Sequence, residues 1–539
     1  MTRQRLRRSL LAGACGLALV ASLPAGASSA PRPATPTPQA SPDSTAAQRW
    51  TTKNATASGT GGAVASVDPE ATHVGIEVLR KGGNAVDAAI ATAAALGVTE
   101  PYSTGIGGGG YLVYYDAKTK KVSTLDGRET APQSIPHDAF IDPKTSQPYP
   151  FTPDLVTSGV SVGVPGTAAT WQQALDRWGT YSLRKALKPA EKVARRGFVV
   201  DDTFREQTLQ NKERFAAVST TADLYLPDGD APKVGSVFRN PDLAATYDAL
   251  GREGTKIIYQ GRVGSDIVRT VQDPPKTADA TLPFPKGYLE RSDLAAYRVV
   301  KHKPTKVTYR GLDVYSIAPS SSGGSTVGEA LNILGTKKLS TLPHTEALHD
   351  YLDASTLAFA DRNAYVGDPA FVDVPLATLL SKPFARSRAC LITDRALPTP
   401  TQPGALDATG CATAPSVGQN DPGTSTSHLV TSDRWGNVVS YTLTIEQTGG
   451  SGIVVPGRGF LLNNELTDFT AVYDPADPNR IEGGKRPRSS MAPTIVLKNG
   501  RPVYAVGSPG GSTIITTVLQ TLVNRIDLGM TLPEAVAAP

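Results

Sequence analysis

Thr426 is the hydroxyl residue whose place in the sequence best suits covalent chemistry. It follows residues 396–425, a long stretch rich in Pro, Gly, Thr, Asp and Ser, and it precedes a strand pattern. Loops of that length inside compact proteins usually have a function. A chain cut before Thr426 would expose a hydroxyl nucleophile whose own amine could act as the base. The plain alternative is a hydroxyl at the start of a strand, so neighbouring motifs have to decide.

A glycine turn stands further along the chain, at residues 507–512. It joins a strand pattern to an apolar helix pattern, so the amides of Gly510 and Gly511 can point outward at the helix N-terminus. There they would stabilise a developing oxyanion. An ordinary turn between a strand and a helix would use the same residues.

Two charged segments stand between Thr426 and this turn. Ser489 and Ser490 follow a run of cations, a pattern that suits a carboxylate. Glu465 and Asp468 are three residues apart after an apolar strand pattern and could bind an ammonium group. Solvated surface turns are the alternative for both segments. Together with the nucleophile and the oxyanion turn, they predict a pocket for the zwitterionic head of an amino acid.

The segments around these residues predict the elements that must position them. Residues 428–433 and 438–447 form a hairpin pattern around the turn at 434–437, and a strand at 501–507 leads into a helix at 513–526. Upstream, the pattern predicts helices over 69–79 and 84–96, strands over 111–116 and 122–129, a mainly helical region over 180–275, and a hairpin of 305–310 with 313–318. This irregular alternation favours layered α+β sheets over a doubly wound parallel sheet.

Composition and motifs exclude several classes of protein. The 539 residues carry 54 basic and 49 acidic side chains, a balance that argues against a nucleic-acid partner. The six His show no zinc-type spacing, so no metal and no cofactor are expected. Gly105–Gly110 formally matches G-x-G-x-x-G but precedes a strand pattern, which predicts a tight turn and no nucleotide site. Ser182–Lys185 matches S-x-x-K without its companion motifs, as a surface helix would.

The N-terminal segment resembles an export signal. Residues 1–27 combine four Arg, an apolar run and small residues, and residues 28–50 form a Pro-, Ala- and Thr-rich linker expected to be disordered. We therefore expect a secreted or cell-envelope protein without a membrane span, exported by either the general or the twin-arginine route. Only Cys390 and Cys411 remain after signal removal, and two cysteines in an exported chain usually form a disulfide.

Several longer blocks resemble one known family. The C-terminal part contains TSHLVTSDRWGNVVSYTLTIEQ, FLLNNELTDF, KRPRSSMAPTIV and VGSPGGSTIITTVLQ. The preceding part contains GGNAVDAAIA, EPYSTGIGGGGYLVYYD, LDGRETAP and LAFADRNAYVGDP. These blocks, in this order, resemble the γ-glutamyltranspeptidases, which are N-terminal nucleophile hydrolases that mature by self-cleavage. The resemblance implies a four-layer αββα fold, with a large subunit at 51–425 and a small subunit at 426–539 that pair as a heterodimer.

The resemblance also assigns roles, position by position. It implies that Thr426 becomes the nucleophile when the Ser425–Thr426 bond breaks, and that Thr444 hydrogen-bonds it. The resemblance implies that Arg128, Ser489 and Ser490 hold the α-carboxylate of the donor and that Glu465 and Asp468 hold its α-ammonium. It implies that Glu446 is a further donor contact, at a position that is often Asn in the family. It implies that Gly510 and Gly511 form the oxyanion hole.

The implied activity is that of an exported γ-glutamyl hydrolase/transpeptidase. Its donors would be glutathione, glutamine, γ-glutamyl peptides or poly-γ-glutamate, and its acceptors water, amino acids or peptides. The segment between Asp468 and Lys485 is short compared with members that carry a lid loop, so an open site is expected. The family continues beyond the position of Pro539, so the small subunit is expected to be C-terminally incomplete. The alternatives are a cephalosporin or glutaryl acylase of the same fold and an uncleaved, inactive envelope binding protein.

Overall fold

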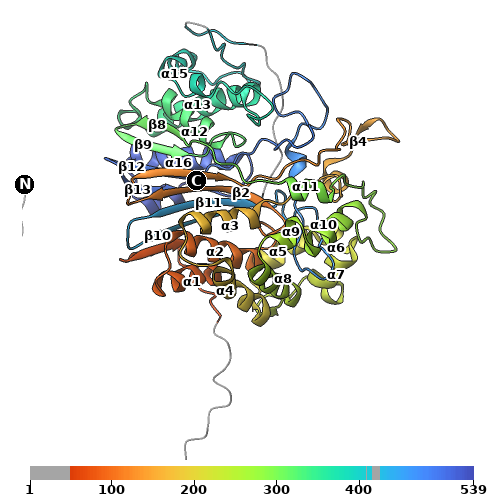
Figure 1. Cartoon of the computed structure of the whole chain (residues 1–539). Coiled ribbons are helices and arrows are strands. Elements are labelled where there is room, and N and C mark those ends of the chain that lie inside the picture. Colours follow the sequence, from red (N-terminus) through yellow and green to blue (C-terminus); the bar gives the residue numbers. More distant parts are fainter. Residues whose placement is uncertain (1–48, 408–409, 415–424) are drawn as a thin grey trace, which may run out of the picture. The chain divides into compact units, whose positions relative to one another are not determined.

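Two antiparallel sheets stack face to face in the computed structural model, which describes residues 49–407, 410–414 and 425–539 (Figure 1). The five-stranded sheet has the order β1 (Gly62–Ala65), β10 (Ser427–Asp433), β11 (Val438–Thr444), β2 (Gly109–Asp116) and β3 (Lys121–Asp126). The four-stranded sheet has the order β13 (Arg501–Val506), β12 (Thr494–Lys498), β9 (Leu312–Ser316) and β8 (Thr305–Tyr309).

Helices cover the outer face of each sheet (Figure 1). The five-stranded sheet packs against α2 (Ala85–Thr99) and α3 (Thr167–Trp178), with α1 (Pro69–Arg80) and α4 (Leu183–Arg196) outside α2. The four-stranded sheet packs against α12 (Gly323–Leu334), which α13 (His344–Tyr365) and α16 (Thr513–Ile526) flank. The order helix, sheet, sheet, helix confirms the four-layer αββα architecture that the family resemblance implies.

The buried position of α2 explains its unusual composition. Its capping box joins Asn84 and Asp87, and every residue from Ala85 to Thr99 is buried. A helix that is apolar on all sides must be enclosed on all sides, and small alanines let the neighbouring layers approach closely. The predicted helices at 69–79 and 84–96 correspond to α1 and α2.

Strand β11 is also buried along its whole length. Its two faces meet different layers, because one packs on α2 and the other meets the second sheet through Val113, Val438, Ile495 and Leu497. This explains why even the hydroxyl residues that alternate with the apolar ones in VVSYTLT are buried, unlike those of a half-exposed strand. The hairpin predicted at 428–447 is present as β10 and β11, but the second strand ends at Thr444, earlier than the sequence pattern predicts.

The strand predicted at 122–129 likewise ends early, at Asp126. The Asp126 carboxylate accepts a hydrogen bond from the Arg128 amide at 2.9 Å, a local turn that takes the chain out of the sheet. Arg128 therefore stands beyond the strand end and not on the sheet.

The remaining elements are peripheral, and the region predicted to be mainly helical contains α4 to α10. The other helices are α5 (Asp202–Gln210), α6 (Lys212–Ala216), α7 (Ser219–Tyr225), α8 (Pro241–Glu253), α9 (Lys256–Tyr259), α10 (Arg262–Gln272), α11 (Arg291–Ala296), α14 (Leu376–Leu379), α15 (Lys382–Ala389) and α17 (Leu532–Ala537). Two short strand pairs are β4 (Ile141–Asp142) with β5 (Gln147–Pro148) and β6 (Phe198–Val199) with β7 (Val237–Phe238).

Three sequence predictions concern residues that the structure describes only in part. The proposed signal peptide at 1–27 lies outside the described residues, as does the linker up to residue 48, and the loop at 396–425 is described only in part.

Within the described ranges, no helix has the length and apolar character needed to cross a membrane. The structure joins Cys390 and Cys411 in a disulfide.

Candidate active site

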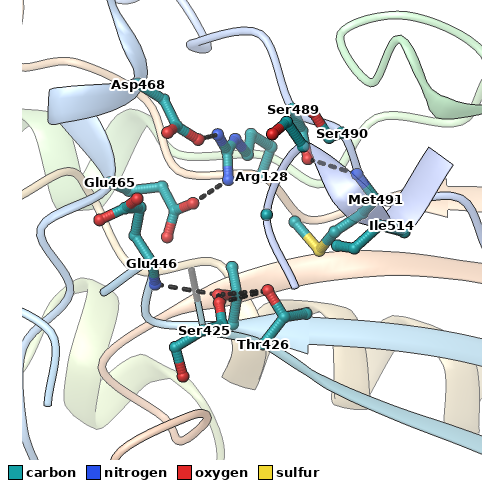
Figure 2. Close-up of a pocket in the computed structure, with 13 residues that line it drawn as sticks. Arg128, Ser425, Thr426, Glu446, Glu465, Asp468, Ser489, Ser490, Met491 and Ile514 are labelled. Atoms are coloured by element: carbon teal, nitrogen blue, oxygen red, sulfur yellow. Dashed lines mark hydrogen bonds and ion pairs between the residues drawn. The ribbon is translucent and has the colours of Figure 1, made fainter. Parts of the chain in front are cut away.

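Thr426 lies immediately before β10, inside the sheet sandwich and only 8% exposed. Its hydroxyl lies against the carbonyl oxygen of Ser425 and donates to the Thr444 hydroxyl over 3.3 Å (Figure 2). Thr444 in turn donates to the same Ser425 carbonyl at 3.0 Å. Two hydroxyls therefore converge on the peptide group that joins Ser425 to Thr426.

The strands fix this geometry. Thr444 is the last residue of β11 and pairs with Gly109 of β2, next to the turn that the sequence predicts at Gly105–Gly110. A Cβ at Gly108 would lie 2.0 Å from the Thr444 carbonyl oxygen, so only glycine allows the turn to approach this closely. The turn precedes β2 and not a helix, as the sequence predicts, and its glycines serve packing behind Thr444.

Arg128, Glu465 and Asp468 form a buried charged cluster above the threonines (Figure 2). One terminal nitrogen of Arg128 pairs with Glu465 and the other with Asp468, while its Nε donates to the Pro487 carbonyl at 3.2 Å. Arg128 and Glu465 are each only 1% exposed. The predicted carboxylate-binding residue Arg128 and the predicted ammonium-binding acids are thus brought together, and in this structure they contact each other.

The excess of acids in this cluster changes their protonation. Burial raises the pKa of Glu465 to about 8 even though Arg128 opposes the shift, and Asp468 adds to it. Burial and the same two carboxylates also raise the pKa of Glu446. Although burial opposes it, the attraction of Glu465 and Asp468 raises the pKa of Arg128. One cation therefore serves several acids, and the cluster is short of positive charge.

Glu446 stands just beyond the end of β11. Its backbone φ is +78°, unusual for a residue other than glycine, and its amide donates to the Thr444 hydroxyl at 2.9 Å. Its carboxylate accepts from Asn464. The chain thus turns sharply after the catalytic strand and places this carboxylate in the pocket that Thr426 lines.

Ser489 and Ser490 form another wall of this pocket. The Ser489 hydroxyl oxygen accepts from the Met491 amide at 3.1 Å, and the Ser490 hydroxyl oxygen accepts from Arg362 Nη2 at 2.9 Å. Arg362 belongs to the block LAFADRNAYVGDP but has no role assigned from the sequence. No local signal marks it, because its contact with Ser490 joins residues that are far apart in the chain.

The glycine turn lies where the sequence predicts, between β13 and α16. Gly510 and Gly511 both have positive φ, at +120° and +56°, which favours glycine. Gly511 lines the pocket together with Ser512. Met491 and Ile514 also line it, and they are apolar neighbours that the sequence analysis does not identify.

No histidine or lysine is among the residues that line this pocket. His428, two residues after Thr426, donates to or accepts from the Thr442 hydroxyl at 2.8 Å, and burial lowers its pKa to about 3. It is therefore neutral and outside the pocket. The described pocket lining therefore offers the Thr426 hydroxyl no imidazole or lysine base.

The segment between Asp468 and Lys485 folds away from the pocket. Phe469 and Ile481 pack into an apolar cluster with Ile135 and Phe140, and the Tyr473 ring stacks on His137 with centroids 3.9 Å apart. None of its residues is among those that line the pocket.

Across the described ranges, no group of three or more His, Cys, Asp or Glu side chains could hold a metal ion.

Solved structures share this fold. A cephalosporin acylase from Bacillus halodurans is 29% identical, with a TM-score of 0.74 over 92% of this chain and 85% of its own. The γ-glutamyltranspeptidase of Helicobacter pylori is 32% identical, with a TM-score of 0.59 over 66% of this chain and 97% of its own. The stacked sheets and these structural neighbours place the chain in the class of N-terminal nucleophile hydrolases.

Sequence comparison identifies the family within that class. The family model described as gamma-glutamyltranspeptidase matches residues 71–539, so the chain belongs to the γ-glutamyltranspeptidase family. The "Glutathione hydrolase proenzyme" of Bacillus subtilis strain 168 is 41% identical over 89% of this chain and 80% of its own length. The "Acylase ACY 1 proenzyme" of Pseudomonas sp. strain V22 is 34% identical over 91% and 84%.

Proposed function

We propose that the protein is a γ-glutamyl hydrolase/transpeptidase that uses Thr426 to take γ-glutamyl groups from glutathione or other γ-glutamyl compounds and pass them to water, amino acids or peptides. One observation carries the proposal. Thr426, Thr444 and the cluster of Arg128, Glu465 and Asp468 line a single pocket. A nucleophile beside a site for an amino-acid head suits this chemistry.

Maturation would begin at the two converging hydroxyls. The Thr426 hydroxyl attacks the Ser425 carbonyl carbon while Thr444 donates to the carbonyl oxygen, and the C–N bond breaks to leave an ester and a free amine on Thr426. Water then hydrolyses the ester and releases the Ser425 carboxylate. The word "proenzyme" in the names of the relatives supports this step, which would yield a heterodimer of a large subunit that ends at Ser425 and a small subunit that begins at Thr426.

Turnover would repeat the attack on a donor. The Thr426 amine takes the hydroxyl proton as the oxygen attacks the γ-carbonyl carbon, and the amides at Gly510 and Gly511 stabilise the oxyanion. The leaving amine takes the proton and departs, leaving a γ-glutamyl ester that water or an acceptor amine resolves. The α-carboxylate of the donor would meet Arg128 and the two serines, and its α-ammonium would meet Glu465 and Asp468.

Mass spectrometry of the purified protein tests the maturation, and release of the chromophore from a γ-glutamyl anilide tests the activity. We expect two fragments, the smaller beginning with Thr426, and turnover that depends on cleavage. A single unbroken chain without turnover would favour an inactive envelope binding protein.

A cephalosporin or glutaryl acylase of the same fold is the second candidate, because a cephalosporin acylase and an enzyme named Acylase ACY 1 are among the similar proteins. A glutaryl group has no α-ammonium, so it would leave Glu465 and Asp468 without a cationic partner from the substrate. A γ-glutamyl anilide should therefore be used at least tenfold better than the matching glutaryl anilide. The reverse preference would support the acylase.

The export signal leads to a proposal about location. We expect the mature protein in the medium or at the cell envelope of a producing cell, with processing after about residue 27. Fractionation of such cells with an antibody against the chain tests this, and retention of the full-length chain in the cytoplasm would contradict it.

A further inference from the structure

Arg362 stands behind the two serines of the pocket and is 1% exposed. It comes from the last turn of α13, a helix in the outermost layer that contributes no residue to the pocket lining. Its Nη2 donates to the Ser490 hydroxyl oxygen at 2.9 Å, and its Nε donates to the Ser322 hydroxyl oxygen at 2.8 Å. A single guanidinium thus holds two serines from two different loops.

Ser322 extends this contact to the other pocket serine. Its hydroxyl donates to the Ser489 carbonyl at 2.6 Å, and its amide donates to the same oxygen at 2.8 Å. Arg488 ties the segment to α13 from the other side, because its Nη1 donates to the carbonyls of Arg362 and Val366. Residues 488–490 are therefore fixed to the end of α13 by several hydrogen bonds.

The direction of these hydrogen bonds determines where the serine protons point. Arg362 has only donors, so the Ser490 oxygen must accept from it, and the Ser489 oxygen accepts from the Met491 amide. Each hydroxyl proton remains available for an acceptor in the pocket that both serines line. Both serines are thereby set to donate, which is what a carboxylate requires.

We propose that Arg362 is a positioning residue for donor recognition, which orients Ser490 directly and Ser489 through Ser322 so that both hydroxyls donate to the α-carboxylate of the donor. The proposal rests on the proposed function of this pocket. It assigns Arg362 no contact with the substrate and no part in the attack by Thr426. Its loss should therefore weaken donor binding while the chemical step is kept.

Steady-state kinetics of the mature enzyme with a γ-glutamyl anilide test this, together with inhibition by free L-glutamate. Lysine keeps the charge but cannot hold Ser322 and Ser490 with two separate nitrogens. Arg362→Lys should raise KM for the donor and Ki for glutamate about tenfold, with kcat changed less than about threefold. Arg388→Lys is the matched control, because Arg388 is equally buried but pairs with Asp361 and contacts neither serine.

A double mutant shows whether Arg362 acts through Ser490. In a Ser490→Ala background, Arg362→Lys should add less than about threefold to KM, since the group that it orients is gone. Full additivity would overturn the proposal, as would an unchanged KM in Arg362→Lys. If Arg362→Lys does not fold or mature, Ser322→Ala takes its place, and an unchanged KM in that variant is equally contrary. An inactive wild-type enzyme would instead refute the proposed function.

Discussion

The proposed cleavage site and the proposed donor-head site share one pocket but are built in opposite ways. At the first site, Ser425 and Thr426 lie immediately before β10 and Thr444 ends its partner strand β11, and the contacting groups are neutral hydroxyls and a carbonyl. At the head site, Arg128 meets two acids of the 3₁₀ helix Glu465–Asp468, 337 and 340 residues away in sequence, and buried polar side chains make the contacts. The sheet ladder positions the first site, and electrostatic attraction assembles the second.

This difference indicates how the two functions can be separated. In the proposed mechanism, self-cleavage involves the groups at the strand ends, and no donor takes part in it. Donor recognition needs the charged loops, which no strand register fixes. Substitutions at the head site should therefore impair turnover and spare cleavage, whereas substitutions at the strand ends should impair both.

Thr426→Ala should produce the largest effect. Without the hydroxyl there is neither an attack on Ser425 nor an acyl-enzyme, so the chain should remain uncleaved and turnover should fall to background. Denaturing gels and intact mass measure the first result, and a γ-glutamyl anilide measures the second. Cleavage that persists at this bond would show that the nucleophile is a different residue.

Arg128→Ala should separate the two sites. The donor carboxylate loses its guanidinium partner, so the transition-state stabilisation measured by kcat/KM should fall by roughly 2 to 4 kcal/mol. The chain should still be cleaved before Thr426. Because the change also leaves Glu465 and Asp468 buried without their cation, Arg128→Lys serves as the milder control for folding. An uncleaved Arg128→Lys chain with a normal thermal transition would show that the two sites are coupled.

The disulfide provides a control that belongs to neither site. Cys390 and Cys411 are 21 residues apart, so replacing both with serine should lower the free energy of unfolding by roughly 3 kcal/mol through the entropy of the open chain. KM and the cleavage site should not change. Chemical denaturation measures the loss, and two titratable thiols in the native, non-reduced protein would refute the bridge.

The head site should also make donor binding depend on pH. Burial raises the pKa of Glu465 to about 8, so a proton occupies this carboxylate at neutral pH and must leave when an ammonium binds. Donor KM should therefore fall several-fold as pH rises from about 6 to 8.5. The profile should flatten in Glu465→Gln, and an equally steep profile in that variant would assign the titration to another group.

The same shift has the opposite sign for stability. The folded chain holds this proton more tightly than the unfolded chain, in which the carboxyl titrates near 4.5. The contribution of Glu465 is fully present below about 4.5 and is lost as pH rises through about 8. Donor binding and stability should thus respond to pH in opposite directions, and denaturation of the wild type and of Glu465→Gln at both pH values tests this.

The sequence predicts one of these two regions better than the other. The hairpin at 428–447 and the helix at 84–96 carry strong local patterns, and both are present as β10–β11 and α2. The sequence pattern does not predict where β3 and β11 end. A turn in which the Asp126 carboxylate accepts from the Arg128 amide ends β3, and a positive φ at Glu446 follows the end of β11. Neither feature changes the hydrophobic pattern of the sequence.

Long-range contacts are the part that the sequence does not contain in readable form. Strand β1 pairs with β10 across more than 350 residues, and Gly62 is aligned with Asp433. The position of each head-site residue follows from the family resemblance, but its internal ion pairs do not. Arg362 was missed for the same reason, because a helix residue that holds Ser490 from 128 residues away leaves no periodic signal.

The smallest expected effect concerns the length of the donor. The segment between Asp468 and Lys485, which would have to cover the pocket, instead packs against Ile135, and Tyr473 stacks on His137. A pocket that this segment leaves uncovered admits long chains and water alike. Poly-γ-glutamate should therefore release glutamate at a rate within about threefold of glutathione at equal γ-bond concentration, and hydrolysis should compete strongly with transfer. Tyr473→Ala is the sharper version, because freeing the segment should lower the rate with the polymer more than the rate with glutathione. A wild-type enzyme confined to donors of glutathione size would mean that another part of the chain closes the pocket.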